Sequence, residues 1–571
     1  MRGSIPCLLA SVLGIGALAG CDAHAPAPAS THYDLIIRHG TVYDGSGAAP
    51  VVADLAVNGD RIAVIGDLAT ATAAREIDAH GLAVAPGFIN MLSWANDSLM
   101  EDGHAQSDIR QGVTLEVMGE GDSMGPLNEA LKAYSLAHEG DIHYDITWRT
   151  LGEWLELLEH KGISVNVASF VGATTVRENV LGFEDRAPTP EELEHMQALV
   201  REAMEEGALG VGSSLIYAPA FYARTDELVA LCEAAAPYGG MYISHMRSEG
   251  NRLLEGVDEV ITIARDAGIR AEIYHLKAAG RANWDKIDEV FTRVEAARAA
   301  GQEVSANMYA YTAGATGLNA SMPPWVQEGG QDAWVERLKQ PDVRARVVRE
   351  MRTPSNDWEN LLLASGPEGV LLNDFKTDVL KPLTGKTLAA VAAERGESPE
   401  EAAIDLVIED GSRVGAIYFM MSEENVEKEM ARPWVSFGSD EGTPAPAGVF
   451  LKRQPHPRAY GNVARVLGHY VRERKVITLE EAVRRLTSLP ADNLRLDRRG
   501  RLAPDYYADL VVFDPATIQA HATYEQPHQY ATGVVHVFVN GVQVIADGEH
   551  TGAMPGRFVR GPGWKRDQSA R

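Results

Sequence analysis

The sequence predicts an α/β protein in which eight parallel strands, each followed by helical sequence, close into a barrel. Two consecutive strand-like segments, residues 241–245 and 270–275, each end in a histidine, and residues 251–266 between them carry apolar side chains at helical spacing. Six further apolar segments followed by helix-like sequence lie at residues 82–92, 113–120, 165–171, 208–217, 304–311 and 434–440. Because the alternation reaches eight units, it favours a (β/α)8 barrel of the TIM type, whose catalytic groups lie where the strands end.

Short strands near both ends of the chain predict a small β-sandwich domain. These strand-like segments are residues 33–38, 51–57, 61–65, 508–513, 534–539 and 542–545. Turn signals such as Asp44-Gly45, Asn58-Gly59 and Asn540-Gly541 separate them. Since neither set makes a complete sheet alone, we expect residues 32–81 and 490–558 to form one composite β domain beside a barrel of residues 82–489.

The connection between the seventh and eighth strands is too long for an ordinary barrel loop. It contains helical patterns of its own at residues 332–351 and 399–408. An insertion at this point lies on the face where the strands end. We therefore expect residues 319–430 to form a lid or a wall of the substrate site.

The first residues predict a targeting segment. Arg2 precedes an apolar run at residues 5–19 that is too short to span a bilayer. Leu18-Ala19-Gly20-Cys21 resembles the bacterial lipobox, whose cysteine is acylated, although an ordinary secretory signal is the alternative. We expect a signal peptide at residues 1–21, lipid on Cys21, a Pro/Ala tether at residues 22–31, and an exported protein on the periplasmic side. Asp22 slightly favours the inner membrane.

Composition excludes several other classes of protein. A formal net charge of −28 argues against binding to nucleic acid or to an anionic lipid surface, so the only membrane contact expected is the lipid anchor. The chain has three cysteines, Cys7, Cys21 and Cys232. The first two fall in or at the end of the signal, and the third lies on an apolar helical face, which predicts a core residue and no disulfide pair.

Polar groups at the strand ends predict a metal site. His245 and His275 occupy matching positions in consecutive units, so both can reach one metal. Zinc also needs an anionic ligand, and Glu120 after the second strand fits, with Asp122 as the competitor. Asp440 ends the otherwise apolar eighth strand. Burial of a carboxyl there costs free energy unless the group contacts a metal, is protonated or accepts from a hydrogen-bond donor. Beside a metal-bound water it would be a general base.

Motifs over nearly the whole chain resemble one known family. The stretches that carry the resemblance are residues 84–89 (VAPGFI), 110–114 (RQGVT), 207–210 (GALG), 216–219 (IYAP), 244–249 (SHMRSE), 275–280 (HLKAAG), 438–440 (GSD), 456–458 (HPR) and 508–514 (ADLVVFD). Together and in this order they resemble the amidohydrolase superfamily, and within it the N-acyl-D-amino-acid deacylase (D-aminoacylase) family. The resemblance implies a (β/α)8 barrel with a composite β domain.

The resemblance also implies roles for individual residues. His245 and His275 would bind zinc, and Asp440 would be the catalytic acid and base. Arg458 would bind the free carboxylate of an N-acyl amino acid substrate through two hydrogen bonds. Further candidates for contact with the substrate, or for the wall of its site, are Lys277, Tyr309, Tyr311, Arg247, Ser248 and His469.

This chain departs from the family pattern at two places. Where the family has a His-x-His pair at the end of the first strand, this chain reads Asn90-Met91-Leu92-Ser93-Trp94, and none of its 17 histidines forms such a pair. Where the family has a metal-binding cysteine on the second strand, this chain has Glu120 between glycines. These departures predict one Zn²⁺ per chain, held by Glu120, His245 and His275, and a site narrowed by Trp94.

We therefore expect a zinc-dependent hydrolase that cleaves the amide bond of N-acyl amino acids, with the D configuration implied by the resemblance alone. A cyclic-amide hydrolase or a dipeptidase on the same barrel is an alternative enzyme. The alternative from another class is a binding lipoprotein that kept the barrel and lost the chemistry with the His-x-His pair.

Overall fold

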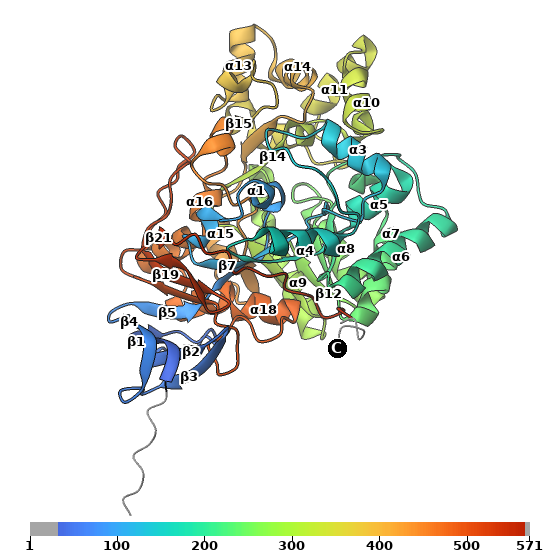
Figure 1. Ribbon diagram of the computed structural model, residues 1–571. Coiled ribbons are helices and arrows are strands. Elements are labelled where there is room, and N and C mark those ends of the chain that lie inside the picture. The colour runs from blue at the N-terminus through green and yellow to red at the C-terminus, as the bar shows by residue number, and fades with distance from the viewer. Residues whose placement is uncertain (1–31, 566–571) are drawn as a thin grey trace, which may run out of the picture.

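The computed structural model describes residues 32–565 and contains the predicted barrel (Figure 1). In the described part of the chain the barrel strands are β6 (Phe88–Asn90), β7 (Val113–Met118), β8 (Asn166–Ser169), β9 (Val171–Gly172), β10 (Gly210–Ser214), β11 (Met241–His245), β12 (Arg270–Ile273), β13 (Val304–Met308) and β17 (Val435–Phe437). Each pairs with its neighbour in parallel, and β8 and β9 are one strand interrupted at Phe170. The Met91 N–H donates to the Phe437 carbonyl at 3.1 Å and closes the ring between β6 and β17. The predicted fold class is thus confirmed.

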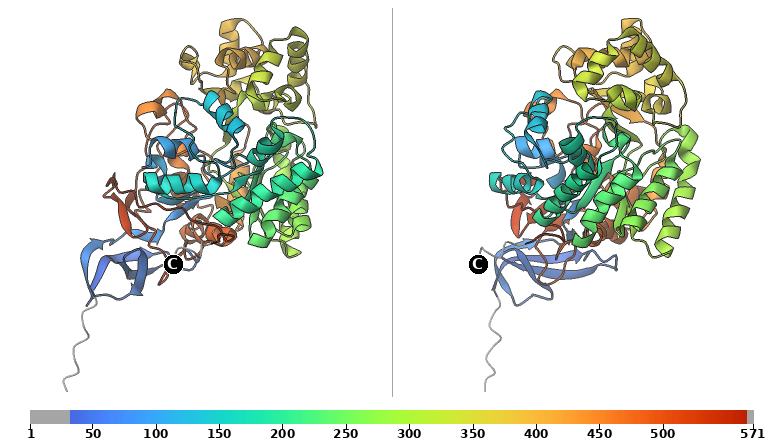
Figure 2. Two further views of the ribbon diagram at one scale, coloured as in Figure 1. Left: turned by 45° about the vertical axis from the view of Figure 1, so that its right-hand side comes forward. Right: turned by 90° about the vertical axis from the view of Figure 1, so that its right-hand side faces the viewer.

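Helices surround the barrel (Figure 2), and their buried apolar side chains join those of the strands in one cluster. They include α4 (Leu151–Lys161), α5 (Ala173–Leu181), α6 (Pro190–Glu206), α7 (Thr225–Ala235), α8 (Leu253–Ala267), α9 (Ile287–Ala299), α15 (Glu423–Met430), α16 (Arg458–Arg465) and α17 (Leu479–Leu486). In α8, Val257, Val260 and Ile263 are buried, and Gly268 ends the helix in the left-handed conformation that glycine adopts readily.

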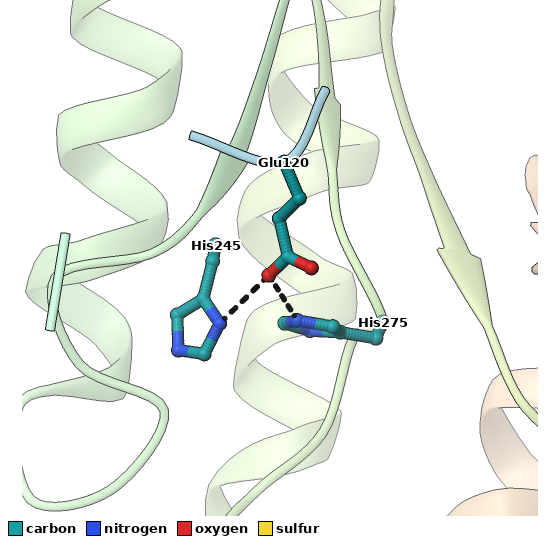
Figure 3. A group of neighbouring side chains, drawn as sticks. All are labelled: Glu120, His245 and His275. Carbon is teal, nitrogen blue, oxygen red and sulfur yellow. Dashed lines mark hydrogen bonds and ion pairs between the residues drawn. The ribbon is translucent and has the colours of Figure 1, made fainter. Parts of the chain in front are cut away.

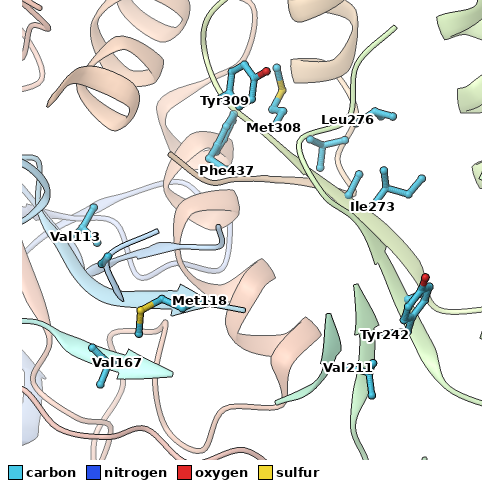
Figure 4. Close-up of a cluster of buried hydrophobic side chains, with 14 of the residues drawn as sticks. Val113, Met118, Val167, Val211, Tyr242, Ile273, Leu276, Met308, Tyr309 and Phe437 are labelled. Atoms are coloured by element: carbon cyan, nitrogen blue, oxygen red, sulfur yellow. The ribbon is translucent and has the colours of Figure 1, made fainter. Parts of the chain in front are cut away.

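The wall of the barrel has an apolar cluster on each side. On β11, Tyr242 packs in the cluster between strands and helices, whereas Met241 and Ile243 belong to the cluster that fills the barrel. Figure 4 shows members of the outer cluster from several strands, including Val113, Val211, Tyr242, Ile273 and Phe437. Because side chains alternate along a strand, His245 at the end of β11 lies on the same face as Met241 and Ile243.

The first predicted strand, residues 82–92, is divided in the structure. β5 (Ala83–Pro86) pairs with the β domain, whereas β6 belongs to the barrel. Gly87 lies between them, and a side-chain carbon there would lie 2.2 Å from Thr114 Oγ1. The Thr114 side chain therefore packs against the backbone at the point where the segment passes from one sheet to the other.

Both ends of the described chain build the β domain. Its remaining strands are β1 (His32–Val42), β2 (Val51–Asn58), β3 (Arg61–Gly66), β4 (Thr72–Asp78), β18 (Leu510–Phe513), β19 (Val534–Val539), β20 (Val542–Ala546) and β21 (Glu549–His550). β18 runs antiparallel to β5 and so joins the segments from the two ends into one sheet. α18 (Ser488–Leu494), by contrast, packs through Ala491 and Leu494 on the cluster inside the barrel.

The insertion after β13 is a compact unit with its own core, drawn in yellow in Figures 1 and 2. It begins with β14 (Ala313–Gly317), which pairs antiparallel with β16 (Gly415–Phe419), as does β15 (Val370–Asp374). Its helices include α10 (Gln331–Leu338), α11 (Pro341–Arg352), α13 (Leu388–Arg395) and α14 (Pro399–Asp410). An insertion between the seventh and eighth strands is therefore present, and it starts directly at the end of β13.

The predicted signal peptide, the lipid on Cys21 and the tether lie outside the described residues. Within residues 32–565, no helix is both long and apolar enough to cross a membrane. Cys232 is buried on α7 with a free thiol.

Candidate metal centre and active site

Glu120, His245 and His275 converge at the ends of three barrel strands (Figure 3). The carboxylate Oε1 of Glu120 lies 2.9 Å from His275 Nε2 and 3.1 Å from His245 Nδ1. One ligand atom of each residue lies within 4.8 Å of the others, and all three side chains are buried. These are the three metal ligands that the sequence predicts. The competing carboxylate, Asp122, is not part of this group.

The chemistry of this donor set fits zinc. Burial raises the pKa of the Glu120 carboxyl, but the two imidazoles lower it more, so the net shift is downward and the side chain is a carboxylate. His245 Nε2 is buried and has no hydrogen-bond partner among the described residues. Two imidazoles and one carboxylate, with a further position open to water, are a typical ligand set of catalytic zinc.

Local backbone geometry explains why Glu120 stands between glycines. A side-chain carbon on Gly119 would lie 2.3 Å from the Phe170 carbonyl oxygen, and one on Gly121 would lie 2.5 Å from Ser214 Cβ. Both glycines also have positive φ, which other residues adopt at a cost. His275 and Asp440 adopt positive φ without being glycine, at 31° and 53°, and such conformations persist where the surrounding structure enforces them.

A buried ion pair lies behind the two histidines. Lys277 Nζ donates to Glu249 Oε1 at 2.6 Å and lies 2.8 Å from His275 Nδ1. The same Glu249 oxygen is 3.0 Å from His275 Nδ1, and its other oxygen is 3.7 Å from His245 Nε2. Glu249 thus faces both histidines on the side away from Glu120, where a carboxylate fixes the ring orientation of a metal ligand.

The sequence pattern gave no role to Glu249, although it closes the motif that contains His245. Glu249 follows His245 by four residues. This spacing brings its carboxylate back to the histidines only if the chain turns back after the strand. The Glu249 N–H donates to Glu359 of the insertion at 2.6 Å, which is one contact that holds this turn.

Asp440 lies in the same cavity and is bound on both oxygens. Its Oδ2 forms an ion pair with Arg458 Nη1 at 2.8 Å, and its Oδ1 accepts from Trp94 Nε1 at 3.1 Å. Burial raises the pKa of Asp440 to about 6, with Glu120 adding to the rise and Arg458 opposing it. A carboxyl with this pKa can exchange a proton near neutral pH.

Arg458 is a fully buried cation with free hydrogen-bonding capacity. Its guanidinium carbon lies 4.4 Å from the centre of the Tyr309 ring, and its Nε has no hydrogen-bond partner among the described residues. A buried donor without a partner is costly, so its presence in the wall of a cavity points to an anionic ligand that the cavity receives.

These groups share one cavity of about 690 Å³. The barrel contributes Glu120, His245, His275, Lys277, Tyr309, Asp440 and Arg458. The insertion contributes several polar groups, including Thr316, Asn373, Lys376, Ser412, Arg413 and Tyr418. The insertion therefore has its own apolar core and also forms a wall of the site.

Four sequence candidates do not reach this cavity. Arg247 donates to Glu259 on α8 and to two backbone carbonyls, and Ser248 accepts backbone N–H groups of its own turn. The hydroxyl of Tyr311 is 3.4 Å from the Pro457 carbonyl. His469 lies on η9 (Val466–Glu473) and pairs with Glu473. The chain leaves the strands before Arg247 and Tyr311, so their side chains follow the loops and not the barrel.

The fold and the site together define a class of protein: barrel hydrolases whose strand ends hold a metal and a general base. The chain belongs to the amidohydrolase family, whose model matches residues 75–545. It is thus a metal-dependent hydrolase that acts on amide C–N bonds.

Three relatives illustrate the similarity. The D-aminoacylase of Alcaligenes xylosoxydans xylosoxydans is 35% identical over 533 residues, which cover 93% of this chain and 98% of the relative. A solved D-aminoacylase structure, studied for the role of its binuclear metal centre with one-metal activation and second-metal attenuation, has a TM-score of 0.77 and 34% identity and covers 92% of this chain and 100% of its own. The N-acyl-D-glutamate deacylase of Bordetella bronchiseptica, solved with zinc and a phosphonate mimic of the tetrahedral intermediate, has a TM-score of 0.75 and 30% identity, with 93% and 100% covered.

Proposed function

We propose that this protein is a zinc-dependent deacylase that hydrolyses N-acyl-D-amino acids to a carboxylate and the free amino acid, with one zinc ion per chain. The observation that carries the proposal is the position of Asp440 and Arg458 in the cavity that contains Glu120, His245 and His275. A metal site, a proton acceptor and a buried cation for a carboxylate are the three parts that this reaction needs. The substrates named for the relatives support the choice of substrate class.

Each residue has a distinct task in the proposed reaction. Zinc, when bound, supplies Lewis-acid polarisation of the substrate carbonyl and a water of lowered pKa. Asp440 accepts the proton of the attacking water and returns it to the amine nitrogen as the C–N bond breaks. Arg458 binds the free carboxylate of the substrate and so aligns the amide with Asp440. Tyr309 supports Arg458 through its ring face.

The test combines metal analysis with a substrate screen of the purified protein. We expect about one zinc per chain, and release of free amino acid from N-acetyl-D-amino acids but not from the L enantiomers. His245→Ala should lose both metal and activity.

Turnover that opens a cyclic amide without release of a second molecule would replace the proposal with a cyclic-amide hydrolase. Cleavage of dipeptides in preference to N-acetyl amino acids would replace it with a dipeptidase. Binding of N-acyl amino acids without metal or turnover would replace it with a binding protein.

We also propose that the protein is exported and carries lipid on Cys21. The support is the Leu18-Ala19-Gly20-Cys21 sequence after an apolar run of signal-peptide length. Mass spectrometry of the mature N-terminus should find a diacylglyceryl-modified Cys21, and Cys21→Ala should move the protein from the membrane to the soluble fraction. Cleavage at another residue without lipid would contradict this.

A further inference from the structure

We infer that Trp94 is a positioning residue: its indole N–H holds Glu120 and Asp440 together and takes the place of a second metal ion between them. The inference rests on the proposed function, because it assigns a task in the same site. It adds a residue-level reason why the centre holds one metal. It also assigns a task to a residue that the sequence pattern only predicted to narrow the site.

Trp94 lies between the two catalytic carboxylates. Its Nε1 is 2.9 Å from Glu120 Oε2 and 3.1 Å from Asp440 Oδ1, so one N–H is shared by two acceptors. Its backbone N–H donates to the Glu441 carbonyl at 2.9 Å, which fixes the residue beside the end of β17. Trp94 lines the cavity, and 37% of the residue's surface is exposed. The contact is therefore made at the surface that substrate meets.

The other oxygens of the two carboxylates face positive or metal-binding groups. Glu120 Oε1 faces the imidazoles of His245 and His275, and Asp440 Oδ2 faces Arg458. Only Glu120 Oε2 and Asp440 Oδ1 turn toward Trp94. Trp94 covers Oε2, so Oε1, which faces both imidazoles, is the Glu120 oxygen best placed for a metal, and the same N–H links Asp440 to Glu120.

An indole N–H is a donor without a free lone pair, so it cannot bind a metal. A cation bridging Glu120 and Asp440 would need the space and the two oxygens that Trp94 uses. Leu92, two residues before Trp94 in the same segment, is fully buried and apolar and offers no ligand. The indole N–H of Trp94 thus gives both carboxylates a hydrogen-bond donor without a second metal ion.

Other tryptophans provide a contrast that separates positioning from packing. The indole N–H of Trp284 donates to a backbone carbonyl, that of Met420. Trp325 in the insertion donates to Glu350 Oε2 at 2.7 Å and is half-buried, but it does not line the cavity. Trp325→Phe is therefore a matched control, because it removes one indole–carboxylate bond outside the cavity.

The test measures zinc affinity by chelator competition, and kcat and KM, for wild type, Trp94→Phe, Trp94→Tyr and Trp325→Phe. We expect Trp94→Phe to weaken zinc binding by about 10- to 100-fold, the range for lost partners of metal ligands. We also expect kcat to fall more than KM changes, and the Co²⁺-loaded variant to show an altered absorption spectrum as Glu120 gains freedom. Trp94→Tyr retains a donor and should recover part of both losses, whereas Trp325→Phe should match wild type.

The outcomes separate this inference from the proposed function. Two tightly bound metals in the wild type, or wild-type zinc affinity and kcat in Trp94→Phe, would overturn the role of Trp94 and leave the hydrolase intact. Absence of metal from zinc-saturated wild type would overturn the proposed function itself. If Trp94→Phe fails to fold, the wild-type stoichiometry and Trp94→Tyr still decide the question.

Discussion

Two sides of the barrel rim use opposite chemistry to hold the same site. The ends of β7, β11 and β12 present Glu120, His245 and His275, which are ionisable and converge within ligand distance. The segment after β6 presents Leu92, which is apolar, and Trp94, which is a neutral donor. On one side of the site, therefore, a hydrogen-bond donor faces the two carboxylates, whereas the other side brings together groups that could bind a metal.

The largest effect should come from a substitution among Glu120, His245 and His275, which form the ligand side of the site. His275→Ala removes a ligand and the partner of Lys277, so we expect loss of zinc and a fall in kcat/KM of about 10⁴-fold or more, since the metal supplies most of the electrophilic catalysis. Zinc content and initial rates measure this. His469→Ala is the control, because this half-buried residue pairs with Glu473 outside the cavity, and it should keep both zinc and activity. Substantial activity in His275→Ala would mean that the ligand side is not the catalytic one.

The second largest effect should come from Asp440, which contacts Trp94 and lies in the same cavity as Glu120, His245 and His275. Asp440→Asn keeps the shape and the contact with Trp94 but cannot accept a proton, so kcat should fall by about 10²- to 10⁴-fold. Zinc content should stay at the wild-type level, because Asp440 is not among the three converging ligands. Loss of zinc in Asp440→Asn would instead place this residue among the ligands.

A smaller effect is expected behind the histidines. Glu249→Gln removes the charge that faces both imidazoles and pairs with Lys277, so zinc affinity should fall by about 10- to 100-fold. Chelator competition measures it. Glu259→Gln is the matched control, because that carboxylate pairs with Arg247 outside the cavity. Equal zinc affinity in both variants would show that Glu249 does not orient the ligands.

The smallest effect concerns a residue that shares a motif with the ligands but points away. Arg247→Lys loses the forked contact with Glu259, and the free energy of unfolding should fall by about 1 kcal/mol or less, as for partly exposed ion pairs. Urea denaturation of the metal-free protein measures it. kcat/KM should equal that of wild type. A clear rise in KM would place Arg247 in contact with substrate.

Much of this architecture follows from local sequence. Alternating strand and helix patterns predict the barrel, because each strand buries both faces and each helix one. Matching histidines in consecutive units predict one site, since parallel strands end at the same rim. Glycines on both sides of Glu120 predict that another segment lies close to this backbone. The structure agrees, since a side-chain carbon on Gly119 would lie 2.3 Å from the Phe170 carbonyl oxygen.

Other features depend on how distant segments meet. Tyr309 and Tyr311 are two residues apart, so a continuous strand would point both side chains to the same face. Of the two, Tyr309 alone lines the cavity, because β13 ends at Met308 and side chains no longer alternate regularly after it. The direction of Glu249 depends on a turn held by Glu359, 110 residues away in the chain. Trp94 meets Asp440 across 346 residues. The barrel, the types of metal ligand and the absence of a His-x-His pair can be read from the sequence, since they reflect local periodicity and residue chemistry. Which side chains share the cavity depends on the folded chain, because loop conformation and long-range contacts set their directions.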